Sequence, residues 1–349
     1  MARINDSSPA RTPANGDPGP FPRPPSTPFT DPEPGMMNEP RPQLPTNSEF
    51  GLIRSQPVPN AGWRKAVHRV TGYNPGESAT ETEHRKLLDR VNQPVRGAFS
   101  VAVLSQKGGV GKTTITVGLG ATLAATRGDR VIAVDANPDF GTLAQRGPDE
   151  TSSTVRDVLF DENIIRYSDM RHHTSQSTSR LEILASERDP ATSEAFSEAD
   201  YRGVLGVLQR FYNVILTDCG TGLVHSAMAG VLHEADMVIV VASPAVDSAR
   251  SAWATLRWLE RNGYSRLVPG ATVVFSASRP GELGLDMDQL ARQFLPRVRA
   301  LHVVPFDDHL AEGAEVNIEL LSRQTRHAFL GLGASVADGF STIRRGTQF

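Results

Sequence analysis

A three-layer α/β domain with a mostly parallel sheet is the fold that the sequence predicts for residues 98–345. Short, nearly continuous runs of Val, Ile and Leu recur along this part of the chain, as they do in strands that are buried on both faces. The segments between these runs are long enough for helices, and crossover helices between successive strands produce a parallel sheet covered on both faces. A glycine-rich loop follows the first run directly and predicts a phosphate site there.

The expected elements follow the order of these runs. A strand over 99–104 leads into the glycine-rich loop, and a helix over 113–126 begins there and ends before Gly128, because glycine is common just beyond a helix C-terminus. The polar run 171–180 is interpreted as a solvated loop. Further strands are expected at 130–135, 181–184, 213–218, 236–242 and 271–276, and a further helix at 248–262.

Residues 1–60 have a different composition. They contain 15 of the 25 prolines, together with Gly, Ser, Thr and acidic residues and few aliphatic residues. Such a segment buries too little apolar surface to offset the entropy lost on ordering it. We expect a disordered Pro-rich tail that serves either as a passive linker or as a docking segment for a Pro-binding partner.

Residues 61–97 are expected to form a short, basic, amphipathic helical segment in front of the α/β domain. Trp63 and Val70 lie at helical spacing among basic residues, and a second helix is expected from Thr80 to a stop before Pro94. Amphipathic helices usually pack on the neighbouring domain, whereas a basic helix that carries Trp also suits a membrane surface or a protein partner. The sequence leaves these alternatives open.

The charge balance and the cysteine content exclude several classes of protein. Lys and Arg number 36 and Asp and Glu number 39, so the net charge of −3 provides no general field for nucleic acid or an anionic membrane. The single cysteine, Cys219, excludes an intramolecular disulfide framework and a cysteine-based zinc site. No signal-like region and no apolar run of roughly 18 residues is present. We therefore expect a soluble, cytoplasmic protein.

The loop at 105–114 carries the clearest binding signal: Ser-Gln-Lys-Gly-Gly-Val-Gly-Lys-Thr-Thr. A strict G-x-x-x-x-G-K-T pattern fails at Gln106, but the glycines still allow backbone N–H groups to point at phosphate oxygens. Lys112 is expected to contact the β- and γ-phosphates of a nucleotide, and the Thr113 hydroxyl is expected to bind Mg²⁺. The residues expected to bind the nucleotide in this loop are Lys107, Gly108, Gly109, Val110, Gly111, Lys112, Thr113 and Thr114.

Two later strands end in an aspartate. Asp135 lies at the carboxyl end of the strand at 130–135, which is where ligands of open α/β sheets bind. Asp218 ends the strand at 213–218 and precedes a Gly-rich turn, as expected of an acid that holds Mg²⁺ beside a phosphate loop. Asp135, Asp218 and Thr113 are therefore the candidate metal-binding residues.

The motif K-G-G-V-G-K-T-T over 107–114 resembles the deviant Walker A motif of the MinD/ParA family of ATPases, and the resemblance continues through the α/β domain. It implies ATP and Mg²⁺ as cofactors and a homodimer that forms with ATP. It also implies that Lys107 reaches the γ-phosphate bound to the partner subunit, where it acts as an arginine finger does.

The resemblance implies further roles and includes one departure. Asp135 matches the first acid of the family's D-x-D-P loop, whereas Asn137 stands where the family has the acid that orients or activates the attacking water. Asp139, two residues further on, is an alternative for that role. Adenine-side contacts are implied for Arg279 and Pro305, in loops that equally suit ordinary connections. The catalytic candidates are therefore Lys107, Asp135 and Asn137.

The Pro-rich tail, the Gly-Trp-Arg segment at 62–64 and the Asn-Pro-Asp variant resemble the EspI-like ATPases associated with type VII (ESX) secretion systems. This resemblance implies a dimerising switch, or a positioning or regulatory ATPase. Asn137 predicts that ATP hydrolysis is slow, and residues 1–97 are expected to recruit a partner. Two alternatives stay open: an ATP-bound scaffold that hydrolyses weakly, favoured by Asn137, and a chromosome or plasmid partitioning ATPase. Association with a membrane, directly or through partners, is another alternative, and nucleic-acid binding is not favoured by the charge.

Overall fold

The computed structural model describes residues 79–137, 141–186, 196–223, 225–281 and 285–342. Within these residues an eight-stranded sheet has the strand order β3-β4-β2-β5-β1-β6-β7-β8, and every neighbouring pair is parallel except β3 and β4. The α/β fold with a mostly parallel sheet is thus confirmed. The expected tail at 1–60 and the expected helix that includes Trp63 lie outside the described residues.

The strands of the sheet lie within one residue of the bounds expected from the sequence, except β3 and β8, for which no bounds were expected. They are β1 (Phe99–Leu104), β2 (Val131–Ala136), β3 (Ser175–Gln176), β4 (Glu182–Leu184), β5 (Val214–Cys219), β6 (Met237–Ala242), β7 (Thr272–Ser276) and β8 (Ala300–Val304). The α-helices are α1 (Ala79–Val91), α2 (Lys112–Thr126), α3 (Val155–Phe160), α4 (Tyr167–Arg171), α6 (Glu198–Leu208), α7 (Ser226–Glu234), α8 (Val246–Arg261), α9 (Met287–Phe294), α10 (Asp308–Ala311) and α11 (Arg323–Ala337). Short 3₁₀ helices are η2 (Leu143–Arg146), η3 (Ser265–Leu267) and η4 (Phe340–Thr342).

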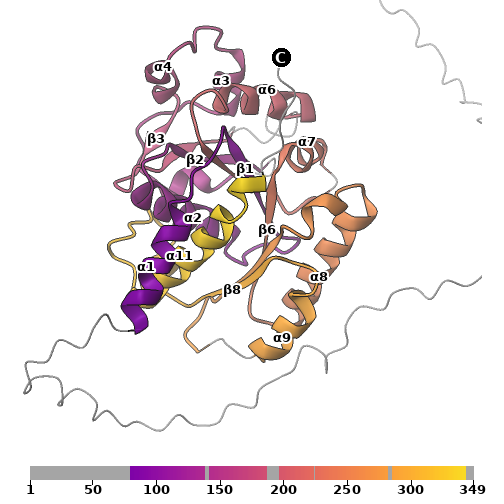
Figure 1. Ribbon diagram of the computed structural model, residues 1–349. Helices are drawn as coiled ribbons and strands as arrows, with labels where there is room; N and C mark the ends of the chain where they lie inside the picture. The colour runs from indigo at the N-terminus through magenta and orange to yellow at the C-terminus, as the bar shows by residue number, and fades with distance from the viewer. Residues whose placement is uncertain (1–78, 138–140, 187–195, 224, 282–284, 343–349) are drawn as a thin grey trace, which may run out of the picture. The chain divides into compact units, whose positions relative to one another are not determined.

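The alternation of side chains along β1 separates the two halves of the core. Val101 and Val103 belong to the apolar layer that includes α2 and α11, whereas Ala102 and Leu104 belong to the layer that includes α6, α7, α8 and α9. Figure 1 shows α1, α2 and α11 together on one face of the sheet. The sheet is therefore buried on both faces, which explains why its strands consist of continuous apolar runs.

The position of β1 determines where a ligand would bind. This strand pairs in parallel with β5 on one side and with β6 on the other. The chain passes from β1 to β2 on one half of the sheet and later continues through β6, β7 and β8 on the other half. The carboxyl end of β1 is thus the point at which the strand order reverses, and open α/β sheets bind their ligands at such a point.

Helix α1 occupies the place of the second helix expected in the 61–97 segment, and it packs on the α/β domain. Arg90 forms an ion pair with Asp338, with 2.6 Å between Nη2 and Oδ2. The buried guanidinium of Arg127 donates hydrogen bonds to the carbonyl oxygens of Val91 and Gln93. Of the alternatives left open for that segment, packing on the domain is the one that α1 shows.

The polar run 171–180 is not the solvated loop that the sequence suggests. It contains β3, and Thr174 and Ser175 within it are buried. The physical reason is Glu182, a buried carboxylate on β4 that accepts hydrogen bonds from the hydroxyl groups of Thr174, at 2.8 Å, and Tyr212. A buried carboxylate requires such donors, so the Thr174 hydroxyl turns inward.

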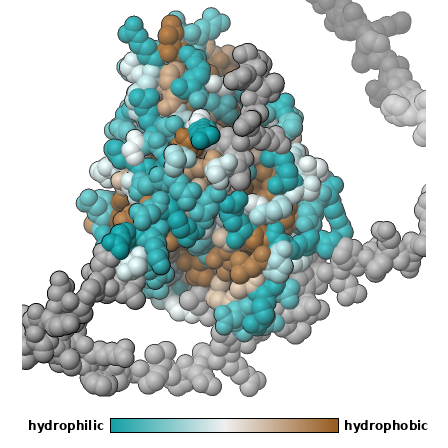
Figure 2. All heavy atoms as spheres, viewed as in Figure 1, coloured by the Kyte–Doolittle hydropathy of each residue, from teal (hydrophilic) through white to brown (hydrophobic). Residues whose placement is uncertain are grey.

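The surface seen in Figure 2 is mostly hydrophilic, and hydrophobic side chains gather in the region of β8, the strand at one edge of the sheet. Phe160 and Ile165, near α3 and α4, are large hydrophobic residues with exposed side chains. Across the described ranges, no helix combines the length and the apolar character needed to cross a membrane.

A partly buried histidine on β8, His302, predicts a pH dependence of stability. Burial, reinforced by the charge of Arg90, lowers the pKa of His302 to about 4, and its ring shares a 2.8 Å hydrogen bond with Ser335. The neutral ring therefore stabilises the fold above the unfolded pKa of about 6.5, and this stability is lost as the pH falls through about 4. We expect wild type to lose about 2 kcal/mol more than His302→Asn between pH 7 and pH 4.5 in urea unfolding. His172→Asn, at an exposed position, should retain the wild-type pH dependence, and the same dependence in all three proteins would contradict the assignment.

Candidate nucleotide-binding site

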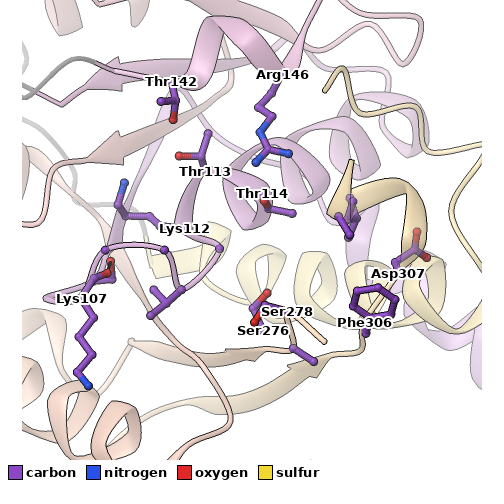
Figure 3. Close-up of a pocket in the computed structure, with 18 of the residues that line it drawn as sticks. Lys107, Lys112, Thr113, Thr114, Thr142, Arg146, Ser276, Ser278, Phe306 and Asp307 are labelled. Atoms are coloured by element: carbon purple, nitrogen blue, oxygen red, sulfur yellow. Dashed lines mark hydrogen bonds between the residues drawn. The ribbon is translucent and has the colours of Figure 1, made fainter. Parts of the chain in front are cut away.

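A cavity of about 430 Å³ lies at the carboxyl ends of the parallel strands. Its walls come from the loops that follow β1, β2, β5, β7 and β8, and Figure 3 shows several of the side chains that line it. Loops from five strands meet here because the carboxyl ends of parallel strands share one edge of the sheet. The expected site residues that line the cavity are Lys107, Gly108, Gly109, Val110, Gly111, Lys112, Thr113, Thr114, Asn137 and Pro305.

The other expected site residues lie elsewhere. Asp135 and Asp218 are buried beneath the cavity rather than on its wall, and Asp218 contacts the phosphate loop from below. Arg279 is exposed and is not part of the cavity lining, although the neighbouring Ser278 is. Asp139, the alternative to Asn137, lies outside the described residues.

The phosphate loop has the backbone geometry that its glycines permit. Gly109 and Gly111 have φ angles of 73° and 88°, in the left-handed region that favours glycine. A Cβ atom at Gly111 would also lie 2.8 Å from the Ser276 hydroxyl oxygen, so a larger residue would clash there. Helix α2 then begins at Lys112 with no capping side chain and no acidic residue in its first turn. Its N-terminal N–H groups and its dipole therefore favour an anion.

Asp218 holds the two functional side chains at the start of α2. The Lys112 ammonium lies 2.9 Å from one carboxylate oxygen, and the Thr113 hydroxyl donates a 2.6 Å hydrogen bond to the other. The Asp218 side chain is almost fully buried and the Lys112 side chain is only 11% exposed. A buried ion pair of this kind fixes the position of both partners, because removing either charge leaves the other without compensation.

Asp135 and Asp218 form a pair of buried carboxylates. They are directly opposite one another in the register of β2 and β5, and each is 1% exposed. Asp135 accepts hydrogen bonds from the backbone N–H groups of Asn137 and Leu143 at 3.0 and 3.1 Å. Burial and the nearby negative charge of Asp218 nevertheless raise the pKa of Asp135 to about 7. A cation close to the pair would relieve this repulsion.

These residues fit a magnesium ion held together with a nucleotide. Mg²⁺ prefers oxygen ligands and is usually bound by one or two carboxylates together with substrate phosphates and water. Asp218, Asp135 and the Thr113 hydroxyl provide such oxygens directly beneath the phosphate loop. Among the described residues, no group of three or more His, Cys, Asp and Glu side chains forms a metal site by itself. The donor set therefore suits a metal that is shared with phosphates.

Lys107 lies at the opposite end of the loop from α2. Its ammonium forms an ion pair with Asp247 in the first turn of α8, and in Figure 3 it points away from Lys112. The side chains of the pair are 41% and 70% exposed. Hydrogen bonding from Lys107 keeps the pKa of Asp247 below its usual value. The two lysines of the loop therefore point in different directions, and only Lys112 is directed toward the buried carboxylates.

The cavity also contains residues that the sequence did not indicate. Ser276 is the last residue of β7 and Ser278 lies in the loop after it, Phe306 and Asp307 follow Pro305, and Arg146 lies at the end of η2. The loops after β7 and β8 were expected near the adenine, so their neighbours follow from the same argument. No motif or spacing rule identifies Arg146, which is far along the chain from the phosphate loop.

Comparisons with known proteins agree with this geometry. A family model described as an AAA domain matches residues 99–261. The ESX-1 secretion-associated protein EspI of Mycobacterium tuberculosis is 39% identical over 290 residues, which cover 82% of this chain and 44% of EspI. The chain therefore spans less than half the length of this relative.

Two solved structures show the same fold. A ParA family ATPase from Chlorobium tepidum TLS has a TM-score of 0.57 at 18% identity, with 68% of this chain and 98% of that chain covered. The septum site-determining protein MinD from Pyrococcus horikoshii OT3, in complex with Mg-ADP, has a TM-score of 0.54 at 22% identity, with 68% and 94% covered.

The parallel sheet, the phosphate loop at its switch point and the buried aspartates beneath it define a P-loop nucleotide-binding protein. The AAA domain match over residues 99–261, the sequence similarity to EspI and the fold shared with the ParA and MinD structures agree with this class.

Proposed function

We propose that this protein is a switch that binds Mg²⁺ and ATP, dimerises with ATP and hydrolyses it slowly, in the service of a type VII (ESX) secretion system. The contact of Lys112 and Thr113 with the buried Asp218 carries this proposal. It brings together, at the N-terminus of α2, a cation for the β- and γ-phosphates and a hydroxyl and a carboxylate for Mg²⁺.

Each residue contributes to phosphoryl transfer in a different way. The loop N–H groups and Lys112 would hold the phosphates, while Thr113 and Asp218 would hold Mg²⁺, Asp218 through water. Mg²⁺ supplies neutralisation of the charge that develops on the transferring phosphoryl group. Phosphoryl transfer depends mainly on positioning and charge neutralisation, so the chain needs little more than this rigid arrangement for basal hydrolysis.

Lys107 supports the proposal of a dimer. Its ammonium serves no phosphate position beside Lys112, because it points outward to Asp247. An exposed ion pair contributes only about 0–1 kcal/mol, so Lys107 can leave Asp247 at little cost. We therefore assign Lys107 to the γ-phosphate bound by a second copy of the chain.

The secretion context rests on the similarity to EspI, which is described as ESX-1 secretion-associated. Because the chain spans 44% of EspI, its partner and the role of residues 1–97 are parts of the proposal. We propose that a protein of the secretion system binds this N-terminal segment and that the nucleotide state of the α/β domain controls the contact. Within the segment, α1 is already packed on α11, which leaves the residues before it for partner binding.

Substitution of Asn137 tests whether this residue limits the rate of ATP hydrolysis. It lines the cavity, and its backbone N–H is held by Asp135, so exchanging the side chain should leave the loop in place. A neutral amide positions water but does not take its proton, whereas a general base typically adds about 10²- to 10⁴-fold to a rate. We expect Asn137→Asp to hydrolyse ATP several-fold faster than wild type, in a phosphate-release assay, with unchanged affinity for ADP. If wild type and Asn137→Asp hydrolyse ATP at equal rates and Asp139→Ala is inactive, Asp139 rather than residue 137 activates the attacking water.

The same residue favours a second candidate function, an ATP-bound scaffold that hydrolyses ATP only weakly. In that case wild type would retain ATP through many cycles of partner binding, and Asn137→Asp would shorten the lifetime of the ATP-bound form. The two functions differ in whether partner release requires hydrolysis. The two functions are separated by measuring partner release after ADP has replaced the bound ATP without hydrolysis. In the control samples a non-hydrolysable ATP analogue stays bound.

A further inference from the structure

Arg146 presents an unpartnered guanidinium to the cavity. It lies at the end of η2 and lines the cavity wall. Its Nη1 atom is buried without a hydrogen-bond partner, and the described part of the chain contains no carboxylate in an ion pair with it. A buried donor without an acceptor is costly, so a group that presents oxygen atoms to this position would be bound.

The other two cations of the site have partners. Lys112 is paired with Asp218, and Lys107 is paired with Asp247. Burial lowers the pKa of Arg146, and the negative charge of Asp218 opposes this effect. A guanidinium remains charged at neutral pH even so, because its normal pKa lies far above 7. Arg146 thus adds a positive charge that no anion of the described chain neutralises by direct contact.

The backbone of Arg146 is fixed from two sides. The N–H of Leu143, at the start of η2, donates a 3.1 Å hydrogen bond to Asp135, and Leu143 itself is fully buried. The Arg146 carbonyl oxygen accepts a 3.1 Å hydrogen bond from the N–H of Val316. The next residue, Gly147, has no room for a side chain, because a Cβ atom would lie 2.5 Å from Ile183. A side chain on so rigid a support loses little entropy when it binds a ligand.

The direction of the side chain indicates the ligand group. In Figure 3 Arg146 enters from the side opposite Ser276 and Ser278, and its guanidinium points toward Thr114 in the first turn of α2. The backbone of a phosphate loop and the helix that follows hold the α- and β-phosphates, whereas the loop lysine reaches the β- and γ-phosphates. Arg146 therefore points to the part of the phosphate chain that ADP and ATP share.

We propose that Arg146 binds the phosphates common to ADP and ATP and so completes the phosphate site from the wall opposite the β7 loop. This inference rests on the proposed nucleotide function. A planar guanidinium suits the task because it donates two parallel hydrogen bonds to phosphate oxygens. The contact contributes to affinity for both nucleotides and does not depend on the γ-phosphate.

The test compares Arg146→Gln, Arg146→Lys and wild type in calorimetric titrations of the full chain with Mg·ADP and with the Mg²⁺ complex of a non-hydrolysable ATP analogue. Arg146→Gln should weaken both affinities by a similar factor, about tenfold or more, because a charge-assisted hydrogen bond is lost. Arg146→Lys should recover part of the loss. The matched control is Arg292→Gln, which removes an exposed arginine of α9 outside the cavity and should bind as wild type does.

Thermal unfolding without nucleotide separates binding from a structural role. Because Nη1 has no partner to lose, Arg146→Gln should unfold at or above the wild-type temperature, while its stabilisation by Mg·ADP is reduced. Unchanged affinity for ADP in Arg146→Gln, a loss confined to the ATP analogue, or an equal loss in Arg292→Gln would each overturn the inference. If wild type itself binds neither nucleotide, the proposed function fails instead.

Discussion

Lys112→Ala is expected to lower the affinity for Mg·ATP and for Mg·ADP by about 100-fold or more. The ammonium is the cation that is paired with Asp218 at the N-terminus of α2, and no other side chain of the phosphate loop replaces it. Losing charge-assisted hydrogen bonds to two phosphates accounts for a factor of this size. Isothermal titration calorimetry measures the effect directly.

The control for Lys112 concerns folding. The alanine variant leaves Asp218 and Asp135 as two buried carboxylates without their nearest cation, which by itself destabilises a protein by several kcal/mol. Lys112→Gln keeps a hydrogen-bond donor toward Asp218 and removes only the charge, so it should remain folded and still fail to bind. A folded Lys112→Gln protein that binds ATP as tightly as wild type would show that the phosphate loop is assigned wrongly.

Lys107→Ala is expected to spare nucleotide binding and to abolish ATP-dependent dimerisation or its turnover. The Lys107 ammonium points away from Lys112 toward Asp247, so its loss removes nothing from the phosphate site of its own subunit. A residue supplied in trans to a transferring phosphoryl group is typically worth about 10³- to 10⁵-fold in rate. We therefore expect the ATPase rate of the variant to fall to the detection limit, while calorimetry with Mg·ADP gives the wild-type affinity.

Asp247→Ala is the matched variant for Lys107. It breaks the same exposed ion pair from the other side and leaves Lys107 in place. If Lys107 acts on a partner subunit, Asp247→Ala should dimerise at least as well as wild type. If the ion pair itself is what matters, the two variants should behave alike, and the assignment of Lys107 to the partner's γ-phosphate would be wrong.

The fold was predictable because most core strands consist of continuous apolar runs that can be recognised in the sequence. Continuous Val and Ile runs such as Met237–Ala242 are buried on both faces, and the strands predicted from such runs begin and end within one residue of their predicted bounds. The two-residue β3 was not predictable, since Ser175 and Gln176 are polar; it directly follows Thr174, whose hydroxyl donates a hydrogen bond to the buried Glu182. Such tertiary demands leave no periodic pattern in the sequence.

The residues of the candidate site were also predictable only in part. The phosphate loop was predictable because its chemistry depends on contiguous residues from Lys107 to Thr114, all of which line the cavity. Asp135 and Asp218 were found as strand ends, and their pairing across β2 and β5 follows from the strand order, which the sequence does not specify. Arg146 was missed because only the fold brings η2 to the cavity. Arg279 was expected near the adenine, but the structure leaves it outside the cavity lining.

The central claim is that nucleotide controls the association of two copies of this chain. Sedimentation velocity of the full chain measures it most directly, in parallel samples with Mg²⁺ and a non-hydrolysable ATP analogue, with Mg·ADP, and without nucleotide. We predict a dimer with the ATP analogue and a monomer in the other two samples, with Lys112→Gln monomeric throughout. A wild-type protein that has the same mass in all three samples, although calorimetry shows the analogue bound, would contradict the account.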